Sequence, residues 1–229
     1  MKKLLTIAAL IAGTALGFSQ GIIVMQNTSA GFAVSTNSAI WGSGQSGVSV
    51  ATVSTANLYY YALLAQTYTG TLTTNDATLG TWTLAEYATN AVTGGMKAPG
   101  GSSGTGVSPW TAPTDAGYTS GSREYYMIVG WSANLGSTWA AVQAQLDSNT
   151  WTPSSGLGYF GVSALANTYA GGGPSSLPAV SVWGAGAGTG SSTGIPSGFQ
   201  LYQVPVPEPT TMALAGLGGL SLLLFRRRK

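Results

Sequence analysis

The sequence predicts an all-β fold, an antiparallel β-sandwich of the jelly-roll type with one or two short helices, placed between two apolar terminal segments. Three observations lead to this fold class. Runs of β-branched and aromatic residues alternate with turn residues, the 229-residue chain contains 34 Gly, and charged residues make up only 6% of it. About 185 residues lie between the terminal segments, which is enough for one domain with a substantial core.

The first segment, residues 1–19, has the order of a secretory signal peptide. Two lysines precede an apolar run at residues 4–16, and small residues follow it. The run is short for a membrane span, and the charged, apolar and small-residue parts come in the expected order. We expect the secretion translocon to engage this segment and signal peptidase to cleave after Gly17 or Ser19. An uncleaved N-terminal anchor helix is the alternative.

Seven segments of the body, residues 20–205, are predicted strands. Each is rich in β-branched or aromatic side chains and is bounded by Gly, Ser, Asn or Pro. They are residues 21–26, 48–53, 58–66, 124–132, 159–163, 179–183 and 199–204. Seven strands with few helices favour a sandwich.

Two further segments have a helical pattern. Thr83 and Glu86 are spaced as a capping box that opens a short helix to about Val92. Ser137 is placed to cap a second helix that ends near Asp147. The apolar residues of this second helix fall at helical spacing and should lie on a sheet face. They are Trp139, Val142 and Leu146.

Glycine-rich motifs in the body are predicted to be loops. Residues 94–106 and 184–198 are rich in Gly, Ser and Pro and have no core-forming period. The G-x-G-x-x-G at residues 42–47 precedes a β pattern, whereas a dinucleotide-binding loop opens a helix. The G-x-S-x-G around Ser102 has no His partner anywhere in the chain.

The composition excludes several classes of site. The chain has no His and no Cys, which removes imidazole bases, Cys nucleophiles, His/Cys zinc sites and disulfides. We therefore assign no catalytic residue, no cofactor and no metal ligand. Residues 21–205 carry Lys97 and Arg123 against five acids, a net charge of −3, which argues against a nucleic-acid partner. The five acids are Asp76, Glu86, Asp115, Glu124 and Asp147.

The last segment, residues 206–229, combines an extended motif with a predicted transmembrane helix. Pro207, Glu208 and Pro209 precede an uncharged apolar run at residues 212–225. The two prolines keep the motif out of a helix and expose the backbone of Glu208 to a protease. A cationic stop follows the run, and it should remain in the cytoplasm while the body lies outside. It consists of Arg226, Arg227, Arg228 and Lys229.

This layout resembles the PEP-CTERM sorting signal of exported bacterial proteins. The resemblance implies recognition by an intramembrane exosortase, removal of the tail near Pro207, Glu208 and Pro209, and transfer to the cell surface or release, often with glycosylation. It covers about the last 25 residues and implies nothing about the activity of the body. A Pro-rich linker before a permanent anchor is the alternative.

The predicted function is that of an exported structural or adhesive protein without catalytic activity. We expect it to be anchored transiently in the inner membrane and then sorted to the cell surface by an exosortase, with surface polysaccharide as a further partner. An extracellular carbohydrate-binding module is the first alternative, because the chain has 7 Trp and 11 Tyr. A glycoside hydrolase that uses two of the five body acids as its carboxylate pair is the second.

The placement of the aromatic residues should decide between these functions. Residues 59–61, 125–126 and 131 are expected to alternate between the core and the opposite face of their strands. Trp110 lies between Pro109 and Thr111 in a predicted loop. Of the aromatic residues, we therefore expect Trp110 to be the one least suited to the core.

Overall fold

The computed structural model describes residues 20–25, 34–40, 57–70, 79–90, 96–97, 107–111, 114–115, 117–118, 121–172, 177–185 and 192–205. The first strands are β1 (Gln20–Gly21), β2 (Ile23–Val24), β3 (Ser35–Ile40), β4 (Tyr59–Thr67), β5 (Thr83–Asn90) and β6 (Met96–Lys97). The later ones are β7 (Val107–Thr111), β8 (Arg123–Ser132), β9 (Tyr159–Val162), β10 (Ala166–Tyr169), β11 (Val180–Ser181) and β12 (Gln200–Gln203). Between β8 and β9 lie the 3₁₀ helix η4 (Ala133–Leu135) and the helix α2 (Trp139–Asp147). The β-rich class is thus confirmed.

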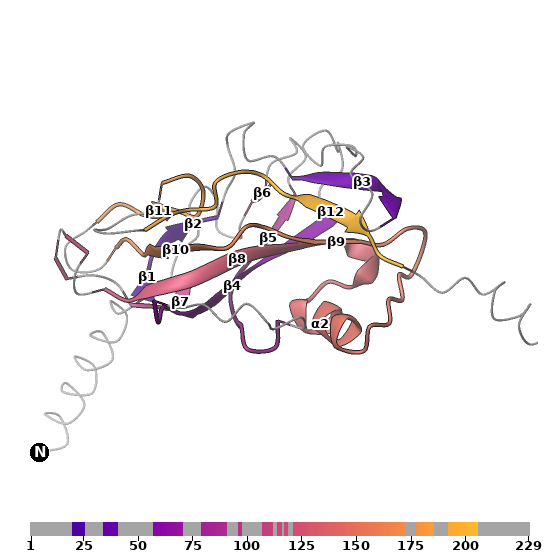
Figure 1. The fold of residues 1–229 in the computed structure, drawn as a ribbon, viewed down its shortest axis with the longest axis horizontal. Helices are drawn as coiled ribbons and strands as arrows, with labels where there is room; N and C mark the ends of the chain where they lie inside the picture. The colour runs from indigo at the N-terminus through magenta and orange to yellow at the C-terminus, as the bar shows by residue number, and fades with distance from the viewer. Residues whose placement is uncertain are drawn as a thin grey trace, which may run out of the picture.

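A large sheet built around β8 and β4 forms the centre of the fold. Its order is β3-β12-β9-β8-β4-β5-β6 (Figure 1). β10 pairs with the first half of β8, on the same edge that β9 pairs with further along. β4 and β8 run antiparallel from the pair Tyr59↔Ser132 to the pair Thr67↔Glu124. Every residue of β8 after Arg123 is buried. This happens because both faces of the sheet are covered.

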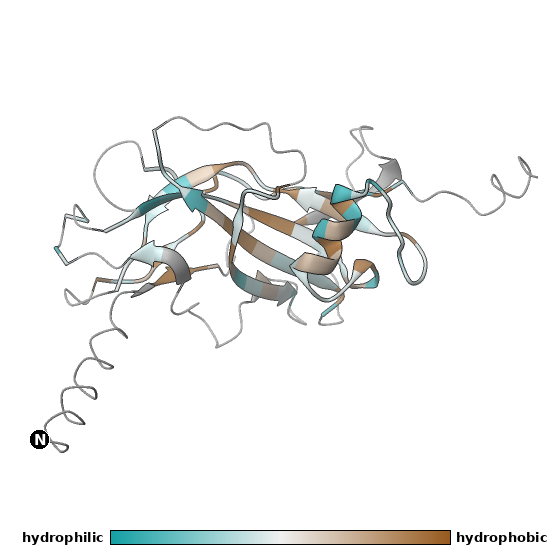
Figure 2. Cartoon of the chain, turned by 90° about the horizontal axis from the view of Figure 1, so that it is seen from below, coloured by the Kyte–Doolittle hydropathy of each residue, from teal (hydrophilic) through white to brown (hydrophobic). Residues whose placement is uncertain are grey.

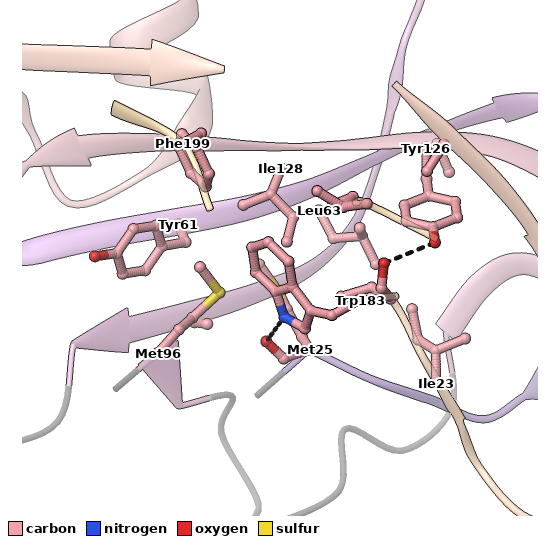
Figure 3. Close-up of a cluster of buried hydrophobic side chains, with 14 of the residues drawn as sticks. Ile23, Met25, Tyr61, Leu63, Met96, Tyr126, Ile128, Trp183 and Phe199 are labelled. Carbon is pink, nitrogen blue, oxygen red and sulfur yellow. Dashed lines mark hydrogen bonds between the residues drawn. The ribbon is translucent and has the colours of Figure 1, made fainter. Parts of the chain in front are cut away.

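One face packs against two small sheets, β1–β7 and β11–β2. The core on this face takes alternate side chains from the two central strands (Figure 3). These are Tyr61, Leu63, Tyr126 and Ile128. The Tyr126 hydroxyl donates a hydrogen bond to the Val182 carbonyl at 2.8 Å, and Trp183 Nε1 donates one to the Met25 carbonyl at 3.4 Å. The buried polar atoms of both aromatic residues therefore have partners.

The other face packs against α2, η4 and the loop that follows α2. Figure 2 shows the helix lying over apolar strands. Trp139 and Val142 are buried and Leu146 packs against the same cluster, so the predicted apolar stripe is confirmed. The helix cap is Thr138 and not Ser137, because the Thr138 hydroxyl accepts a hydrogen bond from the Ala141 amide at 3.3 Å.

The jelly-roll form of the sandwich is not what the described strands build. A jelly roll has eight strands in two sheets formed by Greek keys. Here one large sheet faces two sheets of two strands each. Two pairs are also parallel, β12 with β3 and β11 with β2, whereas the other pairs between named strands are antiparallel. The structure is therefore a mostly antiparallel sheet with partial layers on both faces.

The predicted helix from Thr83 to about Val92 is wrong, because β5 occupies this segment. Glu86 does not cap a helix but accepts a hydrogen bond from the neighbouring Tyr87 amide at 2.9 Å. Ala88 is buried in the core on one face and Tyr87 packs against the core on the other. Two-sided burial and pairing with β4 outweigh a cap that contributes about 1 kcal/mol.

Five of the seven predicted strands correspond to single observed strands, and residues 21–26 correspond to the short β1 and β2. The seventh, residues 48–53, lies outside the described residues. The structure also contains strands that the pattern did not predict, namely β3, β5, β6, β7 and β10. The two predicted Gly-rich loops contribute to the core as well, because Met96 and Ile195 are buried there. Because Gly and Ser flank them, these single apolar residues form no periodic pattern that the sequence would reveal.

The terminal segments fall largely outside the described residues. The predicted signal peptide at residues 1–19 and the predicted transmembrane helix at residues 212–225 both lie there. Among the residues that the structure does describe, no helix has the length and apolar character needed to cross a membrane.

Candidate functional site

The predicted sorting segment leaves the body directly at the end of the large sheet. Val204, one residue past β12, is 1% exposed, and its amide donates a hydrogen bond to the Gly158 carbonyl at 2.9 Å. Pro205 is exposed. The packed body thus ends at Val204, only three residues before Pro207. The side chains of Pro207, Glu208, Pro209 and the cationic stop Arg226–Lys229 lie outside the described residues, so their roles stay predictions.

Tight packing fixes the point of exit. A Cβ atom added to Gly158 would lie 2.7 Å from Leu135 Cδ2 and 2.9 Å from Val204 Cγ2. Such distances are too short for carbon atoms in contact. A side chain at residue 158 would therefore require Leu135 and Val204 to shift, so Gly158 suits the close packing beside Val204.

A cluster of tyrosines around Arg123 lies at the opposite end of the sheet, where β8 begins and β10 ends. The Arg123 guanidinium carbon lies 4.0 Å from the ring centroid of Tyr68 and 6.0 Å from that of Tyr169. Arg123 Nε also donates to Asn167 Oδ1 at 2.9 Å. Arg123, Tyr68 and Tyr169 are all half-buried. The arrangement combines a cation, aromatic faces and an amide at the surface.

Two further tyrosines extend this cluster. The ring centroid of Tyr125 lies 4.7 Å from that of Tyr68, and the centroid of Tyr118 lies 6.4 Å from that of Tyr169. Residues Tyr68, Tyr118, Tyr125, Tyr169, Arg123 and Asn167 are hereafter the arginine–tyrosine cluster. They come from four separate segments of the chain, so no local sequence pattern could have identified them.

Glu124 is a buried carboxyl group on the other face of the sheet. Successive strand residues point to opposite faces, so Glu124 points away from Arg123 although the two are adjacent in sequence. It is 3% exposed, and its Oε2 atom has no hydrogen-bond partner among the described residues. Burial raises the pKa of this carboxyl above its usual range, and hydrogen bonds from Ser122 and Thr67 oppose the shift in part.

The other body acids lie in separate places. Glu86 is opposite Leu63 and Glu124 is opposite Thr67, on the two strands that flank β4. Four residues along β4 and two strand spacings put their Cα atoms about 16 Å apart, whereas glycosidase carboxyl pairs lie about 5 to 10 Å apart. Asp115 accepts a hydrogen bond from the Gly117 amide in a turn at 3.1 Å.

Among the described residues, the remaining candidate acids do not join Glu86 or Glu124 to form a metal site. Asp147 is exposed at the end of α2, and Asp76 lies outside the described residues, as do Ser102 and the G-x-G-x-x-G motif. Within the described ranges, no three acidic, His or Cys side chains come together in a way that could hold a metal ion.

The tryptophans are core residues. The expectation that Trp110 lies outside the core is wrong, because it is 1% exposed and its Nε1 atom donates to the Thr168 carbonyl at 3.1 Å. All six tryptophans within the described residues are buried. The expected alternation of aromatic residues is confirmed, since Tyr61 and Tyr126 lie in one core while Tyr125 and Trp131 lie in the other.

Comparison with known proteins identifies the segment that follows the body. A PEP-CTERM protein-sorting motif matches residues 205–229, as the resemblance predicts. The motif indicates an exported protein that an exosortase processes at the cell envelope or surface. The matched segment begins at Pro205, directly after the last packed residue of the body. No curated protein and no solved structure matches the chain.

Proposed function

We propose that this protein is a structural or adhesive component of the cell surface, without catalytic activity, that an exosortase releases from its membrane tail near Pro207, Glu208 and Pro209. The observation that carries the proposal is the sorting motif at residues 205–229, attached without a spacer to a packed β domain that ends at Val204. A folded domain delivered to the surface by its own tail needs no further chemistry to act there.

The non-catalytic part of the proposal is supported by the inventory of reactive groups. The chain has no His and no Cys. The buried Glu124 and the half-buried Glu86 are too far apart for a carboxyl pair. A hydrolase built on these two acids is therefore disfavoured.

Deletion of residues 207–229 tests the sorting step. Cells that contain the cognate exosortase should shorten the intact chain and move it from the inner membrane to the surface or medium. The chain that lacks residues 207–229 should not be shortened, and no unprocessed form of it should collect in the membrane fraction. Cell fractionation and intact-mass measurement follow both events. Identical distributions, together with an unshortened intact chain, would contradict the proposal.

A double substitution separates the motif from general effects of losing proline. Pro207→Ala with Pro209→Ala should prevent shortening, because the motif then no longer has its fixed extended backbone. Pro196→Ala is the matched control, since Pro196 is an exposed proline of the body. The control should be shortened and sorted as the unchanged chain is.

A second candidate function, carbohydrate binding, is favoured by the arginine–tyrosine cluster. Half-buried aromatic faces beside an amide and a cation can stack on a sugar ring and bind its hydroxyl or carboxyl groups. The tryptophans do not support this role, because those in the described residues are buried. If the body binds glycans, the tyrosines and Arg123 should be responsible.

A glycan array probed with residues 20–205 tests the second candidate. Binding should be lost in Tyr169→Ala and retained in Tyr202→Ala, a half-buried tyrosine of β12 at the opposite end of the sheet. Absence of binding at millimolar ligand, or equal loss in both variants, would rule the cluster out as a glycan site.

A further inference from the structure

Several chain segments converge at the end of the sheet from which the sorting motif leaves. The register places the end of β12 beside the start of β9, through the pair Gln203↔Tyr159. The start of β9 lies beside the end of β8, through Trp131↔Phe160, and the end of β8 lies beside the start of β4, through Tyr59↔Ser132. We call this end of the sheet, with residues 57–58, η4 and residues 152–158, the exit end (Figure 1).

Two leucines are displayed at the exit end. Leu157 is 53% exposed and Leu58 is 44% exposed, more than any other large hydrophobic residue that the structure describes. Both are tied to η4, because the Leu58 carbonyl accepts from the Ala133 amide at 2.8 Å and the Leu157 carbonyl accepts from Asn134 Nδ2 at 3.0 Å. The backbones of both residues are therefore held beside η4, at the end of the sheet from which the chain leaves.

The loop that carries Leu157 is held firmly in place. The Ser154 amide donates to the Asn134 carbonyl at 2.8 Å, and the Thr152 amide donates to Gln145 Oε1 at 2.9 Å. Asn134 is itself fixed, since its Oδ1 atom accepts from the Ser132 hydroxyl at 2.6 Å. Residues 152–158 and 57–58 carry no charge. The exposure of Leu157 is thus a property of an ordered, uncharged surface.

The sequence limits how far this surface can lie from the membrane. Val204 is packed, and the predicted transmembrane helix starts at residue 212, eight residues later. Even fully extended, eight residues span at most about 28 Å. While the predicted helix is in the bilayer, the exit end therefore lies within about 28 Å of the membrane, and a weak apolar contact there gains from the high effective concentration of the membrane.

We propose that Leu58 and Leu157 rest on the lipid interface of the membrane while the tail is anchored, and so position Pro207, Glu208 and Pro209 for the exosortase. The inference rests on the proposed function, which supplies the anchored tail. Uncharged segments that carry exposed aliphatic side chains suit the boundary between headgroups and acyl chains, because such segments lose no charge solvation there.

Single cysteines provide the test, since the chain has no Cys of its own. The exported chain with its tail is reconstituted into vesicles of phosphatidylethanolamine and phosphatidylglycerol, and an environment-sensitive fluorophore is attached at one site. The sites are Leu58→Cys, Leu157→Cys and, as control, Leu165→Cys. Leu165 is 37% exposed and precedes β10, about 17 Å along the sheet from the exit end. Far-UV circular dichroism verifies that each labelled chain is folded.

The probes at residues 58 and 157 should emit at shorter wavelength than the probe at 165 and be quenched more strongly by lipids spin-labelled near the headgroup. A fourth probe, at Leu217→Cys, reports on the tail. Water-exposed probes at 58 and 157 with a lipid-embedded probe at 217 would overturn this inference alone. A water-exposed probe at 217 would overturn the anchored tail and the inference with it. If the probes at residues 58 and 157 become shielded from water only after exosortase is added, the two leucines contact the protease. That result would overturn the proposed lipid contact.

Discussion

The two ends of the large sheet differ in what their side chains offer. The exit end displays Leu58 and Leu157 on uncharged segments and passes the chain to the sorting motif. The other end carries the arginine–tyrosine cluster on one face and the buried Glu124 on the other. The ten residues of β8 separate the two ends by about 30 Å. Of the two body cations, Arg123 thus lies far from the sorting motif, whereas Lys97 of β6 pairs with Thr89 of β5, near the start of β4 and so near the exit end.

The largest effect on stability is expected from replacing the buried tryptophan at each end of the large sheet. Trp131 is 0% exposed and donates to the Gly136 carbonyl at 2.8 Å, while Trp110 is 1% exposed and donates to the Thr168 carbonyl. Trp131→Ala and Trp110→Ala should each lower the free energy of unfolding by about 3 to 5 kcal/mol. Urea denaturation followed by far-UV circular dichroism measures both. A loss below about 1 kcal/mol at one end would show that this end is not packed as described.

The second effect concerns pH and only the arginine–tyrosine end. Because the folded-state pKa of Glu124 is raised, its contribution to stability is complete below the unfolded pKa and is lost as pH rises through the folded pKa. Glu124→Gln should therefore raise the free energy of unfolding at pH 8, because a neutral amide replaces a carboxyl whose ionised form is disfavoured by burial. It should also weaken the decline of stability as pH rises from the unfolded pKa through the folded pKa of this carboxyl.

Glu124→Asp is the matched control for this pH dependence, because it keeps a carboxyl group at the same site. Stability should still decline with rising pH in this variant. Denaturation curves collected at several pH values compare the three proteins. Equal pH slopes in the unchanged chain and in Glu124→Gln would show that Glu124 does not titrate with unfolding.

A smaller effect is expected at α2, the helix that covers one face of the large sheet. Thr138→Ala removes the hydroxyl that accepts from the Ala141 amide, and it should lower the free energy of unfolding by about 1 kcal/mol. Ser137→Ala should change it little, because Ser137 is not the cap. Thermal or urea unfolding distinguishes the two variants. The reverse order of effects would restore Ser137 as the cap.

The smallest effect is expected from the cation–π contact of the arginine–tyrosine cluster. A double-mutant cycle of Arg123→Ala and Tyr68→Ala should give a coupling of about 0.5 to 1 kcal/mol, since both residues are only half-buried. The same cycle with Arg123 and Tyr202 should give none, because Tyr202 lies on β12. Equal coupling in both cycles would mean that the measurement reports a general loss of folding.

Parts of the fold that depend on neighbours along the chain were predictable. β4, β8 and β9 follow from their β-branched and aromatic runs, and α2 follows from the spacing of Trp139, Val142 and Leu146. β5 was not predictable in this way. The capping-box pattern of Thr83 and Glu86 is local, whereas the pairing with β4 that determines the strand comes from about 20 residues away in sequence.

The candidate sites also divide into one that a local sequence pattern predicts and one that depends on residues far apart in the chain. The sorting motif is a linear signal, and the family match at residues 205–229 confirms it. The arginine–tyrosine cluster joins Tyr68, Arg123 and Tyr169 across more than 100 residues of sequence, and no periodicity links them. Trp110 was misjudged because its neighbours resemble a loop, while the partner that explains its burial, the Thr168 carbonyl, is 58 residues away.

The sequence by itself determined the destination of the protein and its β-rich class. Both depend on the order and composition of contiguous residues, which act through local backbone preferences and through transfer between water and apolar surroundings. Only the tertiary structure decided which aromatic residues are buried, that Arg123 and Glu124 lie on opposite faces, and that two exposed leucines lie at the end of the sheet where the chain leaves the body. These features arise from strand register, which brings distant residues together and so has no counterpart in any short stretch of the chain.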